Sequence, residues 1–416
     1  MTVHRLDRLL LGIGDAALAQ VAGARELSIA GLAIDSRQIV RGDAFVALHG
    51  TQTHGIRFAP VAAQRGASVV LAEAPVPADI GTSSQVIEGV PVVWIDNLAS
   101  QVGEIAARFY ERASEAMRVV GVTGTNGKTS CVQMLAQALS FLGHRSATIG
   151  TLGAGVHGQL HEGERTTPDA VAVHRLLAEF RDAGVSHVAM EVSSHALAQH
   201  RVAAVDFDVA AFTNLTRDHL DYHGDMASYG AAKALLFAWP SLRAAVINLD
   251  DAFGPELLAR LDGAVQPLRT SMADNADADV AASAIVTSSN GLSFDLRTPW
   301  GAAPVKSPLL GRFNVANLLT VAGCLGALGE PFERIVAALE NLQPVPGRMS
   351  RLGGQGDLPL VVVDYSHTPD ALEQALTALR AHCAGRLVCV FGCGGERDAG
   401  KRPLMGEIAA RLADVA

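Results

Sequence analysis

The stretch GVTGTNGKTS, residues 121–130, decides the fold of the central part of this chain. It follows an apolar segment that predicts a β-strand, and Lys128 and Thr129 open a segment that predicts an amphipathic helix. Glycines in such a turn let backbone N–H groups face an anion at the helix N-terminus. In a nucleotide site, Lys128 would hold the β- and γ-phosphates and the Thr129 hydroxyl would ligate Mg²⁺. A turn without a ligand is the alternative, because Val122 stands where the strict phosphate-loop spacing has glycine.

The sequence around this loop predicts α/β domains in series, and 416 residues at about 150 residues per domain fit three of them. Residues 1–116 alternate short apolar runs with Gly/Pro turns and helical patterns. Residues 117–345 repeat strands that end in polar residues, with helical stretches between several of them. This pattern predicts a doubly wound parallel sheet, whose ligands bind at the carboxyl ends of the strands.

The last part of the chain, residues 346–416, begins within PVPGR (344–348), whose prolines predict a stiff hinge. Two further strand-to-loop segments follow, each with a helical pattern behind it. A parallel sheet of two strands cannot cover its own faces or edges. We therefore expect a Rossmann-like third domain that is cut short.

Composition limits the class of protein. Apolar residues make up 49% of the chain, which indicates a folded globular protein, and the net charge of −9 argues against nucleic-acid and anionic-membrane partners. Five cysteines without a C-x-x-C pair indicate neither a disulfide framework nor a zinc site. The longest uncharged stretch, 313–329, contains two asparagines and is too short for a membrane span. We expect a soluble, cytoplasmic protein that acts as a monomer.

Polar side chains follow two more of the central strands. Glu191 ends the apolar run of MEVSSH, where a carboxylate would complete a Mg²⁺ shell, although an ion pair or a helix cap explains it equally well. TNLTRDHLDYH then gathers a cluster for which a polar loop is the alternative: Asp218, His219, Asp221 and His223. Because the carboxyl ends of parallel strands meet at one edge, we expect these groups to lie near the phosphate loop.

Three other segments have ordinary explanations when taken alone. Lys233, in YGAAKALLF, lies on a predicted helix and would be a solvated surface lysine. RTTPD, 165–169, is typical of a turn and N-cap before a helix from Ala170. DSR, 35–37, is typical of a corner between a strand and a turn. Residue chemistry alone therefore predicts only a Mg-ATP-dependent protein that activates an acid.

The chain as a whole resembles the Mur ligases of peptidoglycan synthesis. The segments that carry the resemblance keep the family's order and spacing over nearly the whole chain: GTNGKT, TTPD, EVSSHALAQHR, TNLTRDHLDYHG, AAKALLF, GRFNVANLL, PGRM, DYSHTPDAL and FGCGGERDAGKRPLMG. EVSSHALAQHR with DHLDYHG is similar to the member that adds the third amino acid of the peptide. The resemblance implies a three-domain fold, an ADP-forming ligase activity, and a role in cell-wall biogenesis, cell shape and division.

The resemblance implies a nucleotide site built from the phosphate loop and the positions that hold base, phosphate and ribose. These are Gly124, Thr125, Asn126, Gly127, Lys128, Thr129, Ser130, Asn317, Arg348 and Asp364. It also implies two Mg²⁺ ions, of which Thr129 and Glu191 would serve one. His219 and a carbamylated Lys233 would serve the other, since a desolvated lysine can lose its proton and add CO₂. Lys128, Lys233 and His219 are the implied catalytic residues.

The resemblance further implies positions that bind UDP-MurNAc-L-Ala-D-Glu. These are Ile34, Ser36, Thr51, Gln52, Thr53, Thr166, Thr167, Ser193, Gln199 and Arg201. Arg201 would supply positive charge for a diphosphate and carboxylates. Arg397 matches an arginine that contacts the incoming amino acid. The family's Asp-Asn-Pro-Arg signature, which helps to choose diaminopimelate over lysine, would lie beyond Ala416.

The activity implied by the resemblance is amide formation driven by ATP. ATP would phosphorylate the γ-carboxylate of D-Glu, and the amine of meso-diaminopimelate would displace the phosphate. The third domain is expected to close over the central one, because the acyl phosphate would hydrolyse in water. The alternatives are the lysine-adding form of the ligase, a folylpolyglutamate synthetase-like ligase, and a non-catalytic nucleotide-binding regulator. TTPD, SSHALAQHR and the first domain argue against a folate acceptor.

Overall fold

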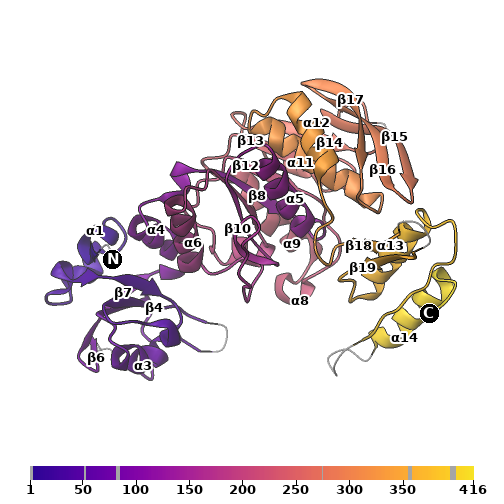
Figure 1. Ribbon diagram of the computed structural model, residues 1–416. Helices are drawn as coiled ribbons and strands as arrows, with labels where there is room; N and C mark the ends of the chain where they lie inside the picture. The colour runs from indigo at the N-terminus through magenta and orange to yellow at the C-terminus, as the bar shows by residue number, and fades with distance from the viewer. Residues whose placement is uncertain (1–2, 51–52, 81–84, 274, 355–357, 394–399) are drawn as a thin grey trace.

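The structure is a computed structural model that describes residues 3–50, 53–80, 85–273, 275–354, 358–393 and 400–416. Figure 1 shows three α/β units in chain order, with the second between the other two. We call them the N-terminal, central and third domains, and keep 1–116, 117–345 and 346–416 as their proposed boundaries. In the described part of the chain, the helices are all too short or too polar to cross a membrane.

A five-stranded sheet forms the N-terminal domain, with the spatial order β3-β4-β5-β7-β6, and only β6 runs antiparallel to its neighbour. Apolar side chains cover both faces of this sheet, which explains why β4 is buried throughout. The elements are β1 (His4–Arg5), α1 (Leu6–Leu9), α2 (Asp15–Ala19), η1 (Ala24–Glu26), β2 (Ser28–Ile29), β3 (Gly31–Ala33), η2 (Ser36–Gln38), β4 (Asp43–Ala47), η3 (Gly55–Phe58), α3 (Ala59–Gln64), β5 (Val69–Ala74), β6 (Val86–Ile87), β7 (Val90–Asp96), α4 (Leu98–Phe109) and η4 (Ala113–Ala116).

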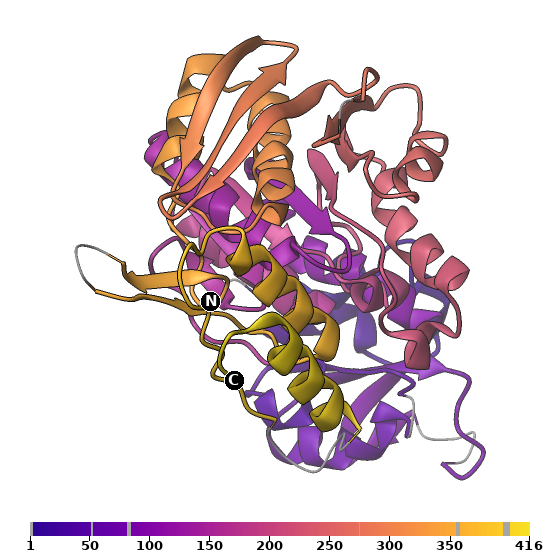
Figure 2. The same ribbon diagram turned by 90° about the vertical axis from the view of Figure 1, so that its right-hand side faces the viewer.

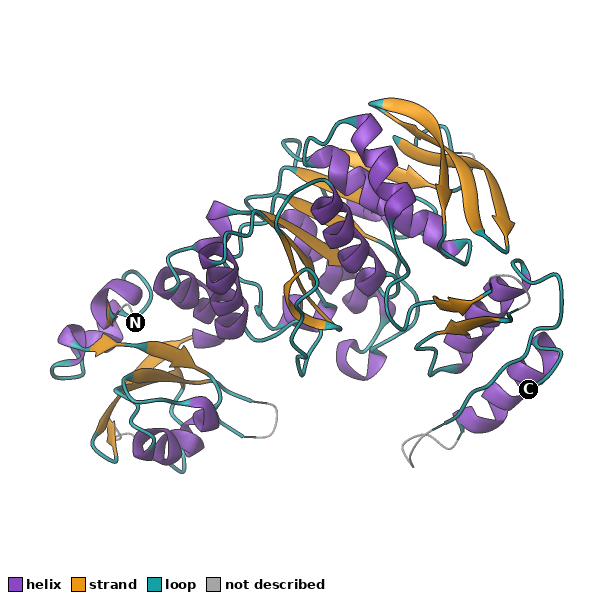
Figure 3. Cartoon of the chain, in the orientation of Figure 1, coloured by secondary structure: helices purple, strands orange, loops and turns teal. Residues whose placement is uncertain are grey.

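A ten-stranded sheet runs through the central domain (Figure 3). Its strands, in spatial order, are β10 (Gly153–Val156), β9 (Ser146–Gly150), β11 (His187–Glu191), β8 (Arg118–Thr123), β12 (Val209–Phe212), β13 (Ala244–Asn248), β14 (Gln266–Ser271), β15 (Val280–Ser288), β16 (Gly291–Thr298) and β17 (Gly301–Ser307). From β9 through β15 the strands are parallel, so the carboxyl ends of β9, β11, β8 and β12 share one edge.

Helices cover both faces of this sheet, as predicted for a doubly wound fold. Leu135 of α5, Leu319 of α11 and Leu339 of α12 share the core on one face, whereas Leu177 of α6 belongs to the core on the other. The helices are α5 (Lys128–Phe141), α6 (Ala170–Asp182), α7 (Ser194–Ala198), α8 (Leu220–His223), α9 (Met226–Ala234), η5 (Leu235–Ala238), α10 (Gly254–Leu258), α11 (Phe313–Ala327) and α12 (Phe332–Asn341).

The predicted parallel sheet is present from β9 through β15, and antiparallel strands extend it at both edges. β10 runs antiparallel to β9, and β16 and β17 extend the other edge as an antiparallel meander after β15. Along β16, Phe294 and Leu296 are buried while Asp295 and Arg297 are exposed. Such alternation is typical of strands with one solvated face, and it is a weaker signal than the continuous apolar runs of the parallel strands.

The third domain contains β18 (Ser350–Gly353), β19 (Leu360–Val363), α13 (Pro369–Arg380) and α14 (Lys401–Leu412). α13 and α14 lie side by side (Figure 2). The predicted parallel pairing of β19 with the strand of RLVCVFGCGG is wrong in the described residues: β19 pairs antiparallel with β18, and the described part of RLVCVFGCGG forms one bridge, between Val388 and Val415. A strand requires a paired neighbour, and this apolar run has none here beyond that bridge. That the domain is cut short stays a prediction.

Candidate functional site

The predicted phosphate loop lies between the end of β8 and the start of α5. Gly124 and Gly127 have φ values of 147° and 87°, a region that side chains rarely adopt. A Cβ atom on Gly124 would also lie 1.9 Å from the hydroxyl of Thr213. Gly127 is the N-cap of α5 and offers no side chain to bond its first N–H groups, while Ser130 lies in its first turn. The loop therefore presents helix N–H groups to an anion.

Lys128 folds back over this loop. Its Nζ donates hydrogen bonds to the carbonyl oxygens of Gly124 and Thr125, both over 2.8 Å. Burial lowers the pKa of Lys128, against the opposing charges of Glu191 and Asp218. The ammonium is thus held by two backbone acceptors that phosphate oxygens can replace.

Lys233 is not a solvated surface lysine, because only 1% of it is exposed. Its Nζ donates to the carbonyl oxygen of Gly124 over 2.8 Å and lies 4.3 Å from the centre of the Tyr229 ring. Burial, and then the charge of Lys128, lower the pKa of Lys233 to about 6, while Asp218 opposes the shift. At neutral pH the amine is mostly unprotonated, which is the nucleophilic form.

Glu191 is a buried carboxylate, 1% exposed, at the end of β11. Its Oε2 accepts hydrogen bonds from the hydroxyls of Thr129 (3.0 Å) and Thr151 (3.1 Å). Its Oε1 accepts from the backbone N–H of Thr151 over 2.7 Å. Hydroxyl and amide donors therefore surround Glu191, in place of the ion pair or helix cap considered as alternatives.

The pairing of Thr129 with Glu191 suits Mg²⁺, which takes one or two protein oxygens and keeps water or phosphate oxygens in its other positions. Within the described ranges, no group of three or more His, Cys, Asp or Glu side chains is placed to hold a metal ion. A cation at Thr129 and Glu191 would therefore complete its shell with ligands from outside the protein.

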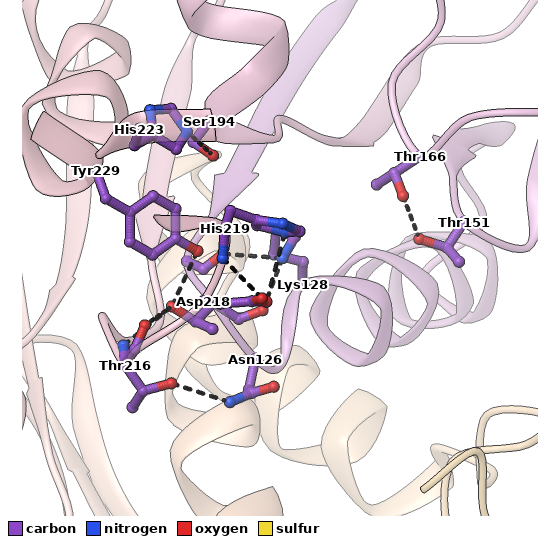
Figure 4. Close-up of polar contacts among 12 residues, drawn as sticks. Asn126, Lys128, Thr151, Thr166, Ser194, Thr216, Asp218, His219, His223 and Tyr229 are labelled. Atoms are coloured by element: carbon purple, nitrogen blue, oxygen red, sulfur yellow. Dashed lines mark hydrogen bonds and ion pairs between the residues drawn. The ribbon is translucent and has the colours of Figure 1, made fainter. Parts of the chain in front are cut away.

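His219 is the residue directly before α8. Its Nε2 is 3.4 Å from a carboxylate oxygen of Asp218, and its ring packs edge-on against His195 with 4.8 Å between centroids. Figure 4 shows His219, Asp218 and Tyr229 gathered beside Lys128. The structure thus brings the acid and histidine cluster of one strand end to the phosphate loop of another.

The TTPD loop touches Glu191 from the other side. The Thr167 hydroxyl donates to the backbone carbonyl of Glu191 over 2.8 Å and accepts from the N–H of Ser193 over 3.2 Å. The hydroxyls of Thr166 and Thr151 are 3.0 Å apart (Figure 4). Glu191 is therefore shared: its carboxylate faces Thr129, and its carbonyl anchors the predicted substrate loop.

Arg201 joins this loop from the turn after α7. Its Nη1 donates to the carbonyl oxygen of Thr167 over 3.1 Å, and its Nη2 donates to Oε1 of Gln199 over 2.6 Å. Gln199 in turn donates to the hydroxyl of Tyr222 over 3.0 Å. Burial and the charge of Arg165 lower the pKa of Arg201. A guanidinium in this position gains from a nearby anion.

The described residues of the N-terminal domain that were predicted to bind the UDP group do not gather at one place. Ser36 is buried in η2, and Ile34, the first residue after β3, packs against the domain core. Thr53 lines a cavity of about 790 Å³ beside β5, whose described lining does not include Ile34 or Ser36. Thr51 and Gln52 lie outside the described residues.

Asn317, Arg348 and Asp364 come from two different domains. The Asn317 side-chain oxygen would lie 2.7 Å from a Cβ atom on Gly127. Arg348 stacks over Tyr365 at 5.4 Å, and its charge helps to lower the pKa of Lys128. Asp364 accepts a hydrogen bond from the backbone N–H that follows Arg348, over 2.9 Å.

Arg397, the predicted amino-acid contact, lies outside the described residues. Three side chains at the loop were missed. Thr151 binds Glu191, the Thr213 hydroxyl donates to the carbonyl oxygen of Asn126 over 2.6 Å, and the Tyr229 hydroxyl lies 3.2 Å from that of Thr125. Thr151 directly follows β9 and Thr213 directly follows β12. Polar residues at strand ends were therefore the signal that could have found them. Tyr229, inside a helix, had none.

Comparisons with known proteins agree with this architecture. "Mur ligase family, catalytic domain" matches residues 28–110, "Mur ligase middle domain" matches 122–325, and "Mur ligase, glutamate ligase domain" matches 347–416. The three-domain Mur ligase fold predicted from the sequence is thereby confirmed.

Individual relatives are similar over most of the chain. The UDP-N-acetylmuramoyl-L-alanyl-D-glutamate--2,6-diaminopimelate ligase of Xanthomonas campestris pv. campestris (strain 8004) is 56% identical over 399 residues, which are 96% of this chain and 79% of that protein. The ligase of the same name from Pseudomonas aeruginosa is 51% identical, over 94% of this chain and 78% of that protein.

Solved structures give the same result. One of a ligase with this name has a TM-score of 0.80 at 34% identity and covers 99% of this chain and 81% of its own. A Mycobacterium tuberculosis folylpolyglutamate synthase complexed with ADP and AMPPCP has a TM-score of 0.57 at 20% identity, over 68% of this chain and 71% of its own, which shows a shared fold. On the strength of the sequence identity to the diaminopimelate ligases, this chain belongs to the Mur ligase family.

Proposed function

We propose that this chain is an ATP-dependent, ADP-forming ligase that adds meso-2,6-diaminopimelate to the D-Glu of UDP-MurNAc-L-Ala-D-Glu in peptidoglycan precursor synthesis. The observation that carries the proposal is the shared position of Glu191. Its carboxylate is bonded to Thr129 of the phosphate loop, and its carbonyl is bonded to Thr167 of the TTPD loop. A phosphoryl group can pass from nucleotide to acceptor only where two such loops are neighbours.

The reaction proceeds in two balanced steps. A γ-carboxylate oxygen of D-Glu bonds to the γ-phosphorus of ATP, and ADP leaves with the electrons of the broken P–O bond. The amine nitrogen then bonds to the acyl carbon, phosphate leaves with the electrons of the C–O bond, and the amine loses a proton. Lys128 and the start of α5 hold the phosphates, and Arg201 orients the anionic acceptor.

Mg²⁺ would be held by Thr129 and Glu191, and a second ion by His219 and a carbamylated Lys233. When bound, the ions neutralise phosphate charge. Lys233 fits this role because a buried amine with a pKa of about 6 is free to attack CO₂ at neutral pH, giving a carbamate and a proton. The carbamate supplies a carboxylate-like group where the described residues offer no group of three or more His, Cys, Asp or Glu side chains placed to hold a metal ion.

The remaining contacts follow from the family. We assign the UDP group to the N-terminal domain, at Ile34, Ser36 and the 51–53 segment, and the muramyl-peptide to the loop that contains Thr166 and to Ser193 and Gln199. The nucleotide extends along the phosphate loop to Asn317, Arg348 and Asp364, and Arg397 contacts the amino acid.

The proposal is tested with the full chain, ATP, Mg²⁺ and UDP-MurNAc-L-Ala-D-Glu, offered with meso-diaminopimelate or with L-lysine. ADP release and product mass are followed together. We expect the tripeptide product with meso-diaminopimelate, formed about 100- to 1,000-fold more slowly by Lys128→Ala. Product with lysine alone would indicate the lysine-adding ligase, and turnover with a folate and glutamate would indicate the folate enzyme. A rate of ADP release that does not depend on any of these acceptors would refute the ligase assignment.

A further inference from the structure

A buried histidine joins the third domain to the central domain. His382 follows α13 and is 5% exposed. Its Nε2 accepts a hydrogen bond from the backbone N–H of Gly311 over 2.8 Å, and its Nδ1 lies 2.6 Å from the carbonyl oxygen of Ser288. Because an N–H can only donate and a carbonyl can only accept, the ring is the neutral tautomer with its proton on Nδ1. Both ring nitrogens thus bind the central domain.

His382 contacts the loop at Leu310 and Gly311. From this loop, hydrogen bonds continue through two side-chain amides toward the phosphate loop. Asn314, in the first turn of α11, donates from Nδ2 to the carbonyl oxygen of Leu310 over 2.7 Å. Its Oδ1 accepts from Nδ2 of Asn317, one turn further along, over 2.9 Å. The Oδ1 of Asn317 then lies against Gly127 of the phosphate loop, within 2.7 Å of the position of a Cβ atom.

These contacts leave little freedom between their two ends. Asn314 and Asn317 are 5% and 7% exposed, and buried amides are costly to leave unpaired. Gly311 has a φ of 86°, and a side chain there would lie 2.6 Å from the Phe313 ring. A movement of α13 must therefore move the 310–311 loop, or break a buried hydrogen bond.

We propose that His382, Asn314 and Asn317 form a relay that couples docking of the third domain to the shape of the phosphate loop, which makes His382 a positioning residue for ATP. The coupling is reciprocal, so bound nucleotide strengthens the docking. The inference deepens the proposed function and rests only on its nucleotide site, since the acceptor plays no part in the relay.

The test is calorimetric binding of a non-hydrolysable ATP analogue with Mg²⁺ to variants of the 416-residue chain, without acceptor. His382→Asn is too short to accept from Gly311, whereas His382→Gln places an oxygen near the position of Nε2. We expect about tenfold weaker binding for the first and recovery to within about threefold for the second, as for loss and rescue of one buried hydrogen bond. Thr287→Val is the matched control, because it removes a neighbouring bond of this interface, Thr287 Oγ1 to Ala381 O over 3.3 Å, while His382 keeps its side-chain bonds to Gly311 and Ser288.

A double-mutant cycle separates a relay from independent packing. Asn314→Ala with His382→Asn should bind the analogue no more weakly than the worse single variant, because both break one chain of contacts. Additive losses, or an unchanged affinity in His382→Asn, would overturn the relay. If the variants fold poorly, hydrogen exchange at Gly311 of the unmodified chain decides instead. Nucleotide should slow this exchange, and an unchanged rate would overturn the proposal. An incorrect acceptor assignment would leave all these results intact.

Discussion

Lys128 and Lys233 donate to one acceptor, the carbonyl oxygen of Gly124, each over 2.8 Å. Two ammonium ions this close repel each other, so one amine is disfavoured as a cation. The pKa of Lys233 is lowered to about 6, by burial first and by Lys128 second. Burial lowers the pKa of Lys128 as well, but the charge of Lys128 opposes only the protonation of Lys233. The proposed function therefore gives the phosphate-binding role to Lys128 and the carbamate to Lys233.

Removing the cation at Lys128 should reduce ligase activity by about 100- to 1,000-fold, the usual loss for a group that stabilises developing charge. The fold should remain, since the described partners of Lys128 are backbone carbonyls of its own loop. Lys128→Ala is compared with Lys306→Ala, an exposed lysine on β17. Circular dichroism and a coupled ADP assay give both quantities. Near-normal turnover in Lys128→Ala would rule out its phosphate role.

Lys233→Ala should be inactive and should regain part of its activity with a small added carboxylate, which replaces the carboxylate-like group of a carbamate. Lys233→Arg should stay inactive under the same treatment, because its side chain fills the space. Mass spectrometry of the unmodified chain in bicarbonate should show a labile CO₂ adduct at Lys233. Absence of both adduct and rescue would contradict the carbamate.

The lowered pKa of Lys233 also predicts a pH dependence of stability in CO₂-free buffer. Between pH 6 and the ordinary value of 10.5, the unfolded chain binds a proton that folded Lys233 has lost. The unfolding free energy therefore rises with pH in this window, by at most about 1.4 kcal/mol per pH unit from this group. Urea denaturation at pH 7 and pH 9 should show a smaller rise in Lys233→Met than in Lys306→Met. Equal rises would mean that Lys233 titrates normally.

Glu191→Gln keeps the size of the side chain and an oxygen for the N–H of Thr151, but removes the charge offered to Mg²⁺. We expect about a 100-fold loss of activity and a higher Mg²⁺ requirement, with an unchanged thermal midpoint. Glu164→Gln, an exposed glutamate before TTPD, is the control. A Mg²⁺ titration of initial rates measures the effect. A variant with the original Mg²⁺ dependence would show that Glu191 serves only to bind Thr129 and Thr151.

Arg201→Ala should weaken calorimetric binding of UDP-MurNAc-L-Ala-D-Glu by about 10- to 100-fold, the cost of losing charge-assisted hydrogen bonds. Affinity for nucleotide should not change, because Arg201 contacts Thr167 and Gln199 rather than the phosphate loop. UDP-GlcNAc is the ligand control, and Arg175→Ala, on the exposed side of α6, is the matched variant. Unmodified chain that does not distinguish the muramyl-dipeptide from UDP-GlcNAc would refute the acceptor assignment.

The central fold was predictable because parallel strands buried on both faces produce continuous apolar runs with polar residues at their ends. The polar residues at and after these strand ends indicated Lys128 and Glu191 as candidate site residues from the sequence alone. The environment of Lys233 was not predictable from spacing, since burial of a helical lysine depends on what packs over it. His382 gave no sequence signal either, because its partners are backbone groups 71 and 94 positions away.

The β15–β16 hairpin has a consequence for how the enzyme tolerates change in length. Its two-residue tip, 289–290, offers carbonyl oxygens to Arg351, and the last residue of β15 offers one to His382. Deleting two residues from each strand preserves which side chains face inward, yet withdraws the tip by about 7 Å. A hairpin shortened in this way would fall short of the third domain. The length of this hairpin therefore sets how far the central domain reaches toward Arg351 and His382.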